Sequence, residues 1–305
     1  MKKIVLLLFF LPLFSAIAQE QEILKKLDAK ADFYGDLARQ MWSNPELGYL
    51  ETKSSALLQK TLVDAGFKVT AGVAGIPTAF VAEYGSGKPV IGIMAEFDAL
   101  PGVSQEAVPF RKAAVEGGAG HACGHHLFGA ASVAAGISIM DWMKANKIKG
   151  TVRVYGTPAE EGGGGKVYIA RAGLISDVDA MIHWHPSSQN AAGATSSLAN
   201  ISTKFRFYGE ASHAAAAPER GKSSLDAVEA MNFMVNLMRE HVPMETRMHY
   251  VITKGGEAPN VVPAFAESYH YVRHPDALVV KQIFERMVKA AEGAALGTQT
   301  RMEYE

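Results

Sequence analysis

The stretch Val90-Ile91-Gly92-Ile93-Met94-Ala95, followed at once by Glu96-Phe97-Asp98, decides the kind of fold that the sequence predicts. A run made only of apolar residues and glycine indicates a strand buried on both faces, as in the centre of an α/β sheet. Residues 151–155 and 180–184 also read as strands. The alanine-rich segment 125–144, with large apolar residues at helical intervals, predicts a buried helix. Together these segments predict a central α/β sheet.

Amphipathic segments precede this core. Residues 21–44 and 53–65 carry apolar side chains at helical spacing, and Pro45 and Gly66 stand where these two helices should end. Residues 79–84 also read as a strand of the sheet.

From about residue 199 the pattern becomes self-contained and predicts a second domain. The expected order is strand, helix, strand, strand, helix, strand, which is typical of a ferredoxin-like α+β fold. The segments are residues 201–208, 223–241, 248–254, 264–274 and 275–295, and a last segment near Arg301. Because 305 residues exceed what one hydrophobic core usually fills, we predict domains at 19–198 and 199–305.

Ligand-type side chains follow three of the expected strands. Asp98 follows the first, Glu160 and Glu161 follow the second, and His185 ends the third. Open α/β sheets build their sites at the carboxyl ends of strands, so these side chains should converge. The run Gly120-His121-Ala122-Cys123-Gly124-His125-His126 adds a thiol and imidazoles. A thiolate, imidazoles and a carboxylate suit a zinc- or manganese-type cation, so the sequence predicts a metallohydrolase.

Cys123 is the only cysteine of the chain, so it cannot form an intrachain disulfide. A lone cysteine is often a small, buried core residue. Cys123, however, lies among glycine and histidine residues and outside any hydrophobic periodicity. This setting favours a metal ligand over a core residue.

The amino terminus reads as a secretory signal peptide covering residues 1–18. Two lysines precede an apolar run over residues 4–14, and Ala16-Ile17-Ala18 offers a small-x-small cleavage site. The apolar run is too short to span a bilayer, so no stable membrane anchor is expected. We therefore predict a periplasmic or secreted protein whose mature chain begins at Gln19.

The overall composition is that of an ordinary globular chain. The formal net charge is −1, with 48% hydrophobic and 20% charged residues. This balance lacks the basic excess typical of nucleic-acid-binding proteins, so nucleic acid is not an expected partner.

Six motifs occur in one order along nearly all of the mature chain. They are Glu96-Phe97-Asp98-Ala99-Leu100-Pro101-Gly102, the Cys123 run, the pair Glu160-Glu161, Trp184-His185-Pro186, Ser212-His213-Ala214-Ala215 and Pro259-Asn260-Val261-Val262-Pro263. With these motifs the chain resembles the M20 family of metallopeptidases and amidohydrolases, and within it the amidohydrolase branch that includes aminobenzoyl-glutamate hydrolases. The resemblance implies an α/β, metal-dependent exopeptidase-like catalytic domain with an inserted ferredoxin-like domain that serves as lid and dimerisation domain.

The resemblance also implies a metal centre. Cys123 and His125 match the first two ligands, Glu161 matches the carboxylate ligand and His185 matches the next imidazole. The implied cofactor is a divalent metal, Zn²⁺ or Mn²⁺, present as one or two ions. Glu160 matches the general base, which would take a proton from the metal-activated water and return it to the leaving amine.

Other polar residues near these motifs have competing interpretations. Asp98 is either an outer-shell carboxylate that orients a ligand histidine or a cap of the turn after its strand. His183 and His185 alternate along a predicted strand, so only one should reach the metal, and the resemblance favours His185. His126 stands where many relatives carry aspartate or asparagine, and His121 has no expected role beyond polar support of the loop.

In the family that the chain resembles, the second domain covers the active site and mediates dimerisation, so a homodimer is implied. A histidine matching His213 reaches a substrate carbonyl there, where it would stabilise an oxyanion. Asn260 and Arg273 match positions that contact the carboxylate end of the substrate. A guanidinium suits that task because it binds a carboxylate in bidentate geometry.

The end of the sequence departs from the family pattern. The family supplies a last metal-ligand histidine after the chain returns to the catalytic domain, whereas this sequence stops at Glu305. We therefore expect a carboxyl-terminally truncated protein with uncovered apolar surface and an unpaired sheet edge in the catalytic domain.

Three hypotheses on function follow. The first is a metal-dependent hydrolase that cleaves the amide bond of a small molecule: an N-acyl amino acid, an aminobenzoyl-glutamate-like compound or a dipeptide. The second is a cysteine hydrolase that uses Cys123 with a nearby histidine, although the sequence offers no strand-to-helix nucleophile elbow. The third is a truncated, non-catalytic remnant that binds metal or dimerises.

Overall fold

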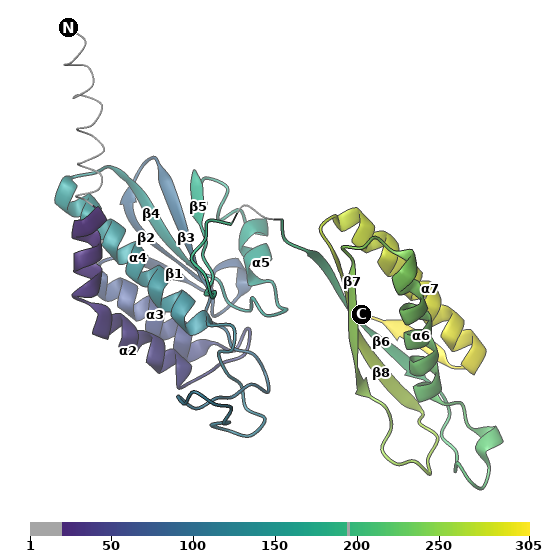
Figure 1. The fold of residues 1–305 in the computed structure, drawn as a ribbon. Coiled ribbons are helices and arrows are strands. Elements are labelled where there is room, and N and C mark those ends of the chain that lie inside the picture. Colours follow the sequence, from purple (N-terminus) through teal and green to yellow (C-terminus); the bar gives the residue numbers. More distant parts are fainter. Residues whose placement is uncertain (1–19, 194–195) are drawn as a thin grey trace. The chain divides into compact units, whose positions relative to one another are not determined.

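The computed structural model describes residues 20–193 and 196–305, and it divides into two compact units between Asn190 and Ala191 (Figure 1). The domain boundary predicted after residue 198 lies a little later in the chain. The predicted signal peptide, residues 1–18, lies outside the described residues. No helix in the described part of the chain is long and apolar enough to cross a membrane.

The first unit contains a five-stranded sheet with the strand order β1-β2-β4-β3-β5. Its strands are β1 (Lys68–Ala71), β2 (Phe80–Ser86), β3 (Val90–Ala95), β4 (Gly150–Gly156) and β5 (Ala180–Ile182). β3 runs parallel to both β4 and β5, whereas β2 runs antiparallel to β4. The carboxyl ends of β3, β4 and β5 therefore lie at one edge of the sheet. The short edge strand β1 was not predicted, since it is mostly exposed and lacks an apolar pattern.

Helices α2 (Ala31–Trp42), α3 (Thr52–Ala65), α4 (His125–Asn146) and α5 (Gly165–Arg171) belong to the first unit. α3 and α4 pack on the sheet, and α2 packs on α4 (Figure 1). The single helix predicted over residues 21–44 is wrong, because a turn at residues 29–30 separates a helical segment at 20–28 from α2. No glycine or proline marks this turn in the sequence.

The core of the first unit lies between α4 and the sheet. Phe80, Ile93 and Val133 belong to one buried cluster. Gly136 of α4 lies so close to β4 that a Cβ at this position would be 2.4 Å from Val154 Cγ2. The small residues of α4 thus let the helix approach the sheet closely, and the beginning of α4 reaches the edge where the three parallel strands end.

A substitution at the end of β4 tests this close packing. In Gly156→Ala, the new Cβ would lie 2.1 Å from Cε1 of Phe80, whose side chain is fully buried. We expect a loss of about 1–3 kcal/mol in the free energy of unfolding, measured by urea denaturation, because the core has no room for the added atom. The control is Gly35→Ala in α2, where the nearest atom is 3.6 Å away. That variant should gain about 0.5–1 kcal/mol, and equal stability of the two variants would contradict the packing argument.

β5 ends at Ile182, so the strand predicted to continue further is too long. Beyond it, His183 Nε2 lies 3.1 Å from Glu96 Oε1, and the indole N–H of Trp184 donates to a serine hydroxyl of α4. These residues contact neighbouring elements through their side chains. In a longer strand they would instead continue the backbone hydrogen bonds of the sheet. His183 and His185 therefore do not lie on a strand, and the prediction that they alternate along one is wrong. The two side chains nevertheless contact different groups.

The second unit has the order strand, helix, strand, strand, helix, strand. Its elements are β6 (Ala199–Tyr208), α6 (Ser224–Leu237), β7 (Arg247–Lys254), β8 (Phe265–His274), α7 (Ala277–Thr298) and β9 (Arg301–Tyr304). The sheet order is β7-β8-β6-β9, and all pairs are antiparallel. α6 and α7 pack on each other and on the sheet (Figure 1). This is the topology of a ferredoxin-like α+β unit.

Side-chain caps begin both helices of the second unit. Ser223 Oγ accepts a hydrogen bond from the N–H of Asp226, and Asp276 Oδ1 accepts one from the N–H of Leu278. These contacts satisfy backbone donors that a helix start leaves free, which explains why α6 and α7 begin where they do.

Candidate metal centre

The candidate site lies at the edge of the first sheet where β3, β4 and β5 end. Asp98 follows β3, Glu160 and Glu161 follow β4, and His185 follows β5. The loop before α4 and the first residue of that helix add Cys123 and His125. Gly124 connects these two with φ 79°, a left-handed conformation that glycine adopts without strain.

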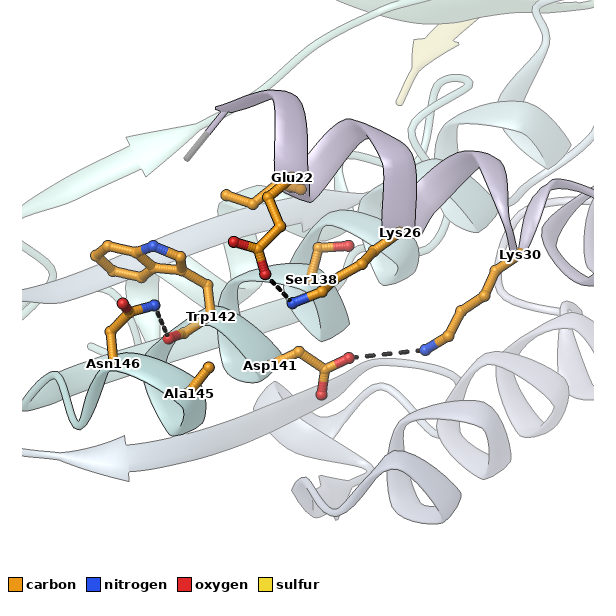
Figure 2. A pocket seen from close by; sticks show the side chains of 9 residues that line it. Glu22, Lys26, Lys30, Ser138, Asp141, Trp142, Ala145 and Asn146 are labelled. Carbon is orange, nitrogen blue, oxygen red and sulfur yellow. Dashed lines mark hydrogen bonds and ion pairs between the residues drawn. The ribbon is translucent and has the colours of Figure 1, made fainter. Parts of the chain in front are cut away.

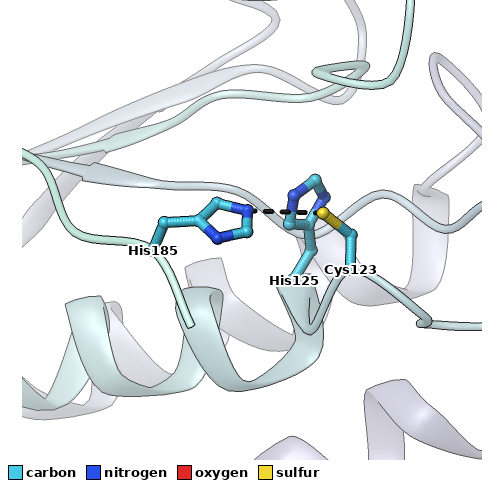
Figure 3. A group of neighbouring side chains, drawn as sticks. All are labelled: Cys123, His125 and His185. Atoms are coloured by element: carbon cyan, nitrogen blue, oxygen red, sulfur yellow. Dashed lines mark hydrogen bonds between the residues drawn. The ribbon is translucent and has the colours of Figure 1, made fainter. Parts of the chain in front are cut away.

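Cys123, His125 and His185 form one group, in which one ligand atom from each residue lies within 4.8 Å of the others (Figure 3). Cys123 Sγ is 3.3 Å from His185 Nε2. His185 Nδ1 lies 2.9 Å from the carbonyl oxygen of Pro186 and can only donate to it. The neutral ring therefore presents the lone pair of Nε2 to the group, which is the tautomer that a metal ligand needs.

Asp98 connects two of the predicted site residues. Its Oδ1 is 2.9 Å from His125 Nδ1, and its Oδ2 accepts a hydrogen bond of 2.8 Å from the N–H of Glu161. The side chains of Asp98 and His125 are both fully buried. Because the Nδ1–H of His125 donates to Asp98, Nε2 is the ring nitrogen left to face the site. This geometry is the one expected of a carboxylate that orients a histidine, and the bond from Glu161 shows that Asp98 also holds the backbone of a loop.

Asp98→Asn tests this orienting role. An asparagine side chain has a single acceptor oxygen, so it cannot serve both His125 Nδ1–H and Glu161 N–H. We expect zinc affinity to fall about 10–100-fold, measured by competition with a chelating indicator. Asp141→Asn, at a half-exposed carboxylate paired with Lys30, should leave zinc affinity unchanged. If Asp98→Asn and the wild type bound zinc with equal affinity, Asp98 would have no part in the metal site.

A strained turn presents the paired glutamates. Ala159 has φ 55°, in the left-handed region, and its N–H donates to the fully buried Glu51 Oε1 at 2.7 Å. Gly163 packs so tightly on this turn that a Cβ there would lie 2.6 Å from Ala159 Cβ. The two carboxylates that follow face different groups. Glu160 Oε2 lies 3.9 Å from His125 Nε2, whereas the side chain of Glu161 contacts the Cys123 thiol.

The electrostatics of the site reflect burial among carboxylates. Burial, together with contact with Glu161, raises the pKa of the Cys123 thiol to about 12. Burial lowers the pKa of His125, but the hydrogen bond and charge of Asp98 outweigh it, and the net shift is upward. Burial, followed by the charge of Glu96, raises the pKa of Glu160. A cation would relieve this crowding of negative and acceptor groups.

Unsatisfied buried atoms indicate that the residues fit a metal ion. Within the described residues, Glu96 Oε2, His125 Nε2 and Glu161 Oε1 are buried and have no hydrogen-bond partner. Such groups are costly unless something satisfies them. A cation bound here would be a partner for all three atoms. Thiolate, imidazole and carboxylate donors together suit zinc, and the carboxylates also admit manganese.

The structure adds three residues that sequence reasoning did not assign to the site. Glu96 is almost fully buried, and its Oε1 contacts both the ammonium group of Lys166 and His183 Nε2. Its Oε2 is 3.1 Å from His125 Nε2. A second potential ligand group thus consists of Glu96, His125 and Glu160. The signal that could have revealed Glu96 is a carboxylate placed directly after a wholly apolar strand.

His121 and His126 of the same motif do not join either ligand group. Both are buried, their rings are 5.1 Å apart, and the ring of His126 is 5.0 Å from that of Trp42. Burial lowers the pKa of each histidine to about 4. They are neutral packing residues behind the site.

The predicted substrate residues lie in the second unit. His213 and Asn260 are on paired loops, since the N–H of Ala214 donates to the carbonyl of Asn260 at 2.9 Å. His213 Nδ1 accepts from the N–H groups of Ala215 and Ala216, both at 3.2 Å, so the neutral ring carries its proton on Nε2. That proton is available to an acceptor, because His213 is itself exposed.

Arg273 lies apart from these loops, on β8. Its Nε is buried and, in the part of the chain that is described, has no hydrogen-bond partner. A cavity of about 460 Å³ adjoins the paired loops and is lined by residues that include Ala214, Pro259 and Val261.

Another pocket of the first unit does not resemble a reaction site. It lies between the helical segment at 20–28 and α4, and it has a volume of about 40 Å³ (Figure 2). Its charged groups are paired, Glu22 with Lys26 and Lys30 with Asp141. None of its lining residues belongs to a candidate ligand group, so we interpret it as a small gap in the packing beside α4.

Known proteins resemble this chain in sequence. The chain is 45% identical over 289 residues to a subunit of the p-aminobenzoyl-glutamate hydrolase of Escherichia coli (strain K12), covering 93% of this chain and 60% of that protein. The chain thus spans about three fifths of the length of that relative. It is 31% identical over 305 residues to Xaa-Arg dipeptidase of Mus musculus, covering 94% of this chain and 67% of that protein.

Solved structures share the fold. A dinuclear metal binding peptidase from the M20 family of Bacillus subtilis aligns with a TM-score of 0.61 and 23% identity, covering 91% of this chain and 74% of the other. At the level of sequence, residues 92–302 match peptidase family M20/M25/M40. This match includes every residue of the candidate site and extends through both units. The chain therefore belongs to peptidase family M20/M25/M40.

Proposed function

We propose that the protein is a metal-dependent amide hydrolase that acts on an N-acyl amino acid, an aminobenzoyl-glutamate-like compound or a dipeptide. The observation that carries the proposal is the group formed by Cys123, His125 and His185 at the carboxyl edge of the parallel strands, with Glu160 beside it. The named activities of the two relatives, a p-aminobenzoyl-glutamate hydrolase and an Xaa-Arg dipeptidase, support amide bonds as the substrate class.

The residues divide the chemistry between them. A divalent cation bound by Cys123, His125 and His185, with Glu161 as the carboxylate ligand, would polarise the scissile carbonyl and lower the pKa of the attacking water. Glu160, whose Oε2 lies 3.9 Å from His125 Nε2, would accept the proton of that water and deliver it to the leaving amine. Asp98 would hold His125 in the tautomer that leaves Nε2 free.

The second unit would bind the substrate. His213, with its proton fixed on Nε2 by two backbone contacts, would donate to the developing oxyanion. Asn260 and Arg273 would contact the carboxylate end of the substrate, and the unpartnered Nε of Arg273 within the described residues supports a ligand there. We propose that this unit also acts as lid and homodimerisation domain.

Metal, assembly and location are part of the proposal. The cation is Zn²⁺ or Mn²⁺, and the name of the Bacillus subtilis structure, a dinuclear metal binding peptidase, supports one or two ions. The Escherichia coli relative is named as one subunit of an enzyme, so size-exclusion chromatography of this chain alone tests the homodimer. The amino-terminal pattern of residues 1–18 supports export to the periplasm or the medium.

Metal content and turnover together test the proposed function. The purified mature chain is analysed by elemental mass spectrometry and assayed against a panel of N-acyl amino acids, p-aminobenzoyl-glutamate and dipeptides. Stoichiometric metal with chelator-sensitive hydrolysis supports the proposal. Metal without hydrolysis of any panel member would favour the non-catalytic alternative, and no bound metal would overturn the ligand assignment.

A further inference from the structure

The 46–51 loop, which joins α2 and α3, lies against the glutamate turn, residues 159–163. A Cβ added at Gly48 would be 2.9 Å from Ala159 Cβ, so the two segments are in close contact. Both contain a residue other than glycine in the left-handed region, with φ 67° at Tyr49 and φ 55° at Ala159. Backbone strain of this kind gathers at functional sites and persists only where the surroundings enforce it. The contact between loop and turn is therefore a candidate for a role in function.

Two side chains of the loop hold the glutamate turn by hydrogen bonds. The Tyr49 hydroxyl donates to the carbonyl oxygen of Gly163 at 2.5 Å, and Glu51 Oε1 accepts from the N–H of Ala159 at 2.7 Å. The other carboxylate oxygen, Glu51 Oε2, accepts from the hydroxyl of Thr78 at 3.0 Å. Glu51 is fully buried, and burial of a carboxylate is costly unless such partners satisfy it. Glu51 thus connects the start of the turn to the protein interior, while Tyr49 binds its end.

The loop is itself fixed at its beginning by Glu46. The Glu46 carboxylate accepts hydrogen bonds from the N–H groups of Lys53 at 3.0 Å and Ser54 at 2.8 Å, at the start of α3. These bonds satisfy backbone donors that a helix start leaves free. The Glu46 carbonyl accepts a further bond of 2.8 Å from the N–H of Ala99, the residue after Asp98. The loop therefore joins the glutamate turn to α3 and to the segment that carries Asp98.

We propose that Tyr49 and Glu51 are positioning residues, which hold the glutamate turn so that the Glu160 carboxylate reaches the attacking water. Glu160 Oε2 is 3.9 Å from His125 Nε2, beyond hydrogen-bond distance, so this contact does not fix the carboxylate. The backbone of the turn sets its direction instead. A misplacement of about 1 Å can lower a rate about 100-fold. The proposal rests on the proposed function, in which Glu160 is the general base.

Glu51→Ala tests the proposal by two measurements on the same sample. The first is hydrogen exchange of the peptide that covers the glutamate turn, followed by mass spectrometry, which needs neither substrate nor metal. The second is kcat, per bound metal ion, and KM for the best substrate of the panel. We expect faster exchange in the turn and a kcat lower by about 10–100-fold, with KM changed less than about twofold. A misplaced general base weakens the transition state and leaves substrate binding intact.

Two further variants separate positioning from general stability. Glu51→Gln keeps an oxygen for the N–H of Ala159, and its amide can donate to the Thr78 hydroxyl oxygen. It should keep kcat and exchange close to the wild type. Ser55→Ala removes the buried bond of 2.7 Å from the Ser55 hydroxyl to the Thr78 carbonyl, which does not involve the turn. It should lower Tm but leave kcat and the exchange of the turn unchanged.

Tyr49→Phe keeps the proposal testable if Glu51→Ala does not fold, as judged by its thermal transition. The Tyr49 side chain is partly exposed, so loss of its hydroxyl leaves the buried core intact. This variant removes the bond to the Gly163 carbonyl and keeps the ring. We expect faster exchange in the turn and a kcat lower by about 2–10-fold, as the loss of one hydrogen bond implies.

The outcomes distinguish this inference from the proposed function. Unchanged kcat or unchanged exchange in folded Glu51→Ala overturns the inference and leaves the hydrolase proposal intact. An equal loss of kcat in Glu51→Gln or in Ser55→Ala also overturns it, because the hydrogen bonds to the turn would then not be the cause. A wild-type protein that hydrolyses no member of the panel overturns the proposed function, whereas the exchange measurement still decides whether the loop holds the turn.

Discussion

Glu160→Gln should lower turnover by about 10²–10⁴-fold while the zinc content of the protein stays unchanged. Glutamine keeps the size and the turn geometry, but it cannot accept the proton of the attacking water. Zinc should remain because Glu160 does not belong to the ligand group formed by Cys123, His125 and His185. The measurement is the initial rate of hydrolysis of the best substrate in the panel, with zinc determined on the same sample.

A matched control carries the same substitution outside the site. Glu106, paired with Lys112 on the surface of the first unit, can be changed to glutamine without altering the candidate site. That variant should keep the wild-type rate. If Glu160→Gln retained more than half of the wild-type rate, the general base would have to be another residue, and Glu96 would be the next carboxylate to examine because it too approaches His125.

The convergence of Asp98, Glu161 and His185 could be predicted from sequence because it follows from strand direction. β3, β4 and β5 are parallel, so residues that follow them meet at one edge of the sheet. Local apolar patterns are sufficient to identify β3 and β4, and with them the edge at which ligands gather. The end of β5 was less predictable, since His183 leaves the ladder for a contact with Glu96 that no local pattern encodes.

The surroundings of Glu96 could not be read from sequence for the same physical reason. Its surroundings come from three separate segments, with Lys166 from the start of α5, His183 from the end of β5 and His125 from α4. A carboxylate after an apolar strand is equally compatible with a solvated turn until these segments are brought together. The tautomer of His213 likewise depends on two backbone contacts that residue types do not specify.

Cys123→Ser should remove zinc and, with it, hydrolysis. A serine hydroxyl does not ionise near neutral pH and is a poor zinc ligand beside the thiolate that it replaces. We expect zinc affinity to fall by more than the roughly 10–100-fold that loss of an outer-shell partner costs. Zinc is measured by elemental mass spectrometry after gel filtration, and turnover is measured on the same fractions. His126→Asn, in the same motif but outside both ligand groups, should keep zinc.

The same variant decides between metal and cysteine chemistry, since Cys123 Sγ lies 3.3 Å from a histidine nitrogen and could also be a nucleophile with a nearby base. A metal ligand predicts that a chelator abolishes wild-type turnover and that added zinc restores it. A nucleophile predicts turnover that persists in the chelator and disappears on alkylation of Cys123. The burial and the contact with Glu161 that raise the pKa of this thiol oppose the thiolate that a nucleophile needs, whereas a bound cation would stabilise that thiolate directly.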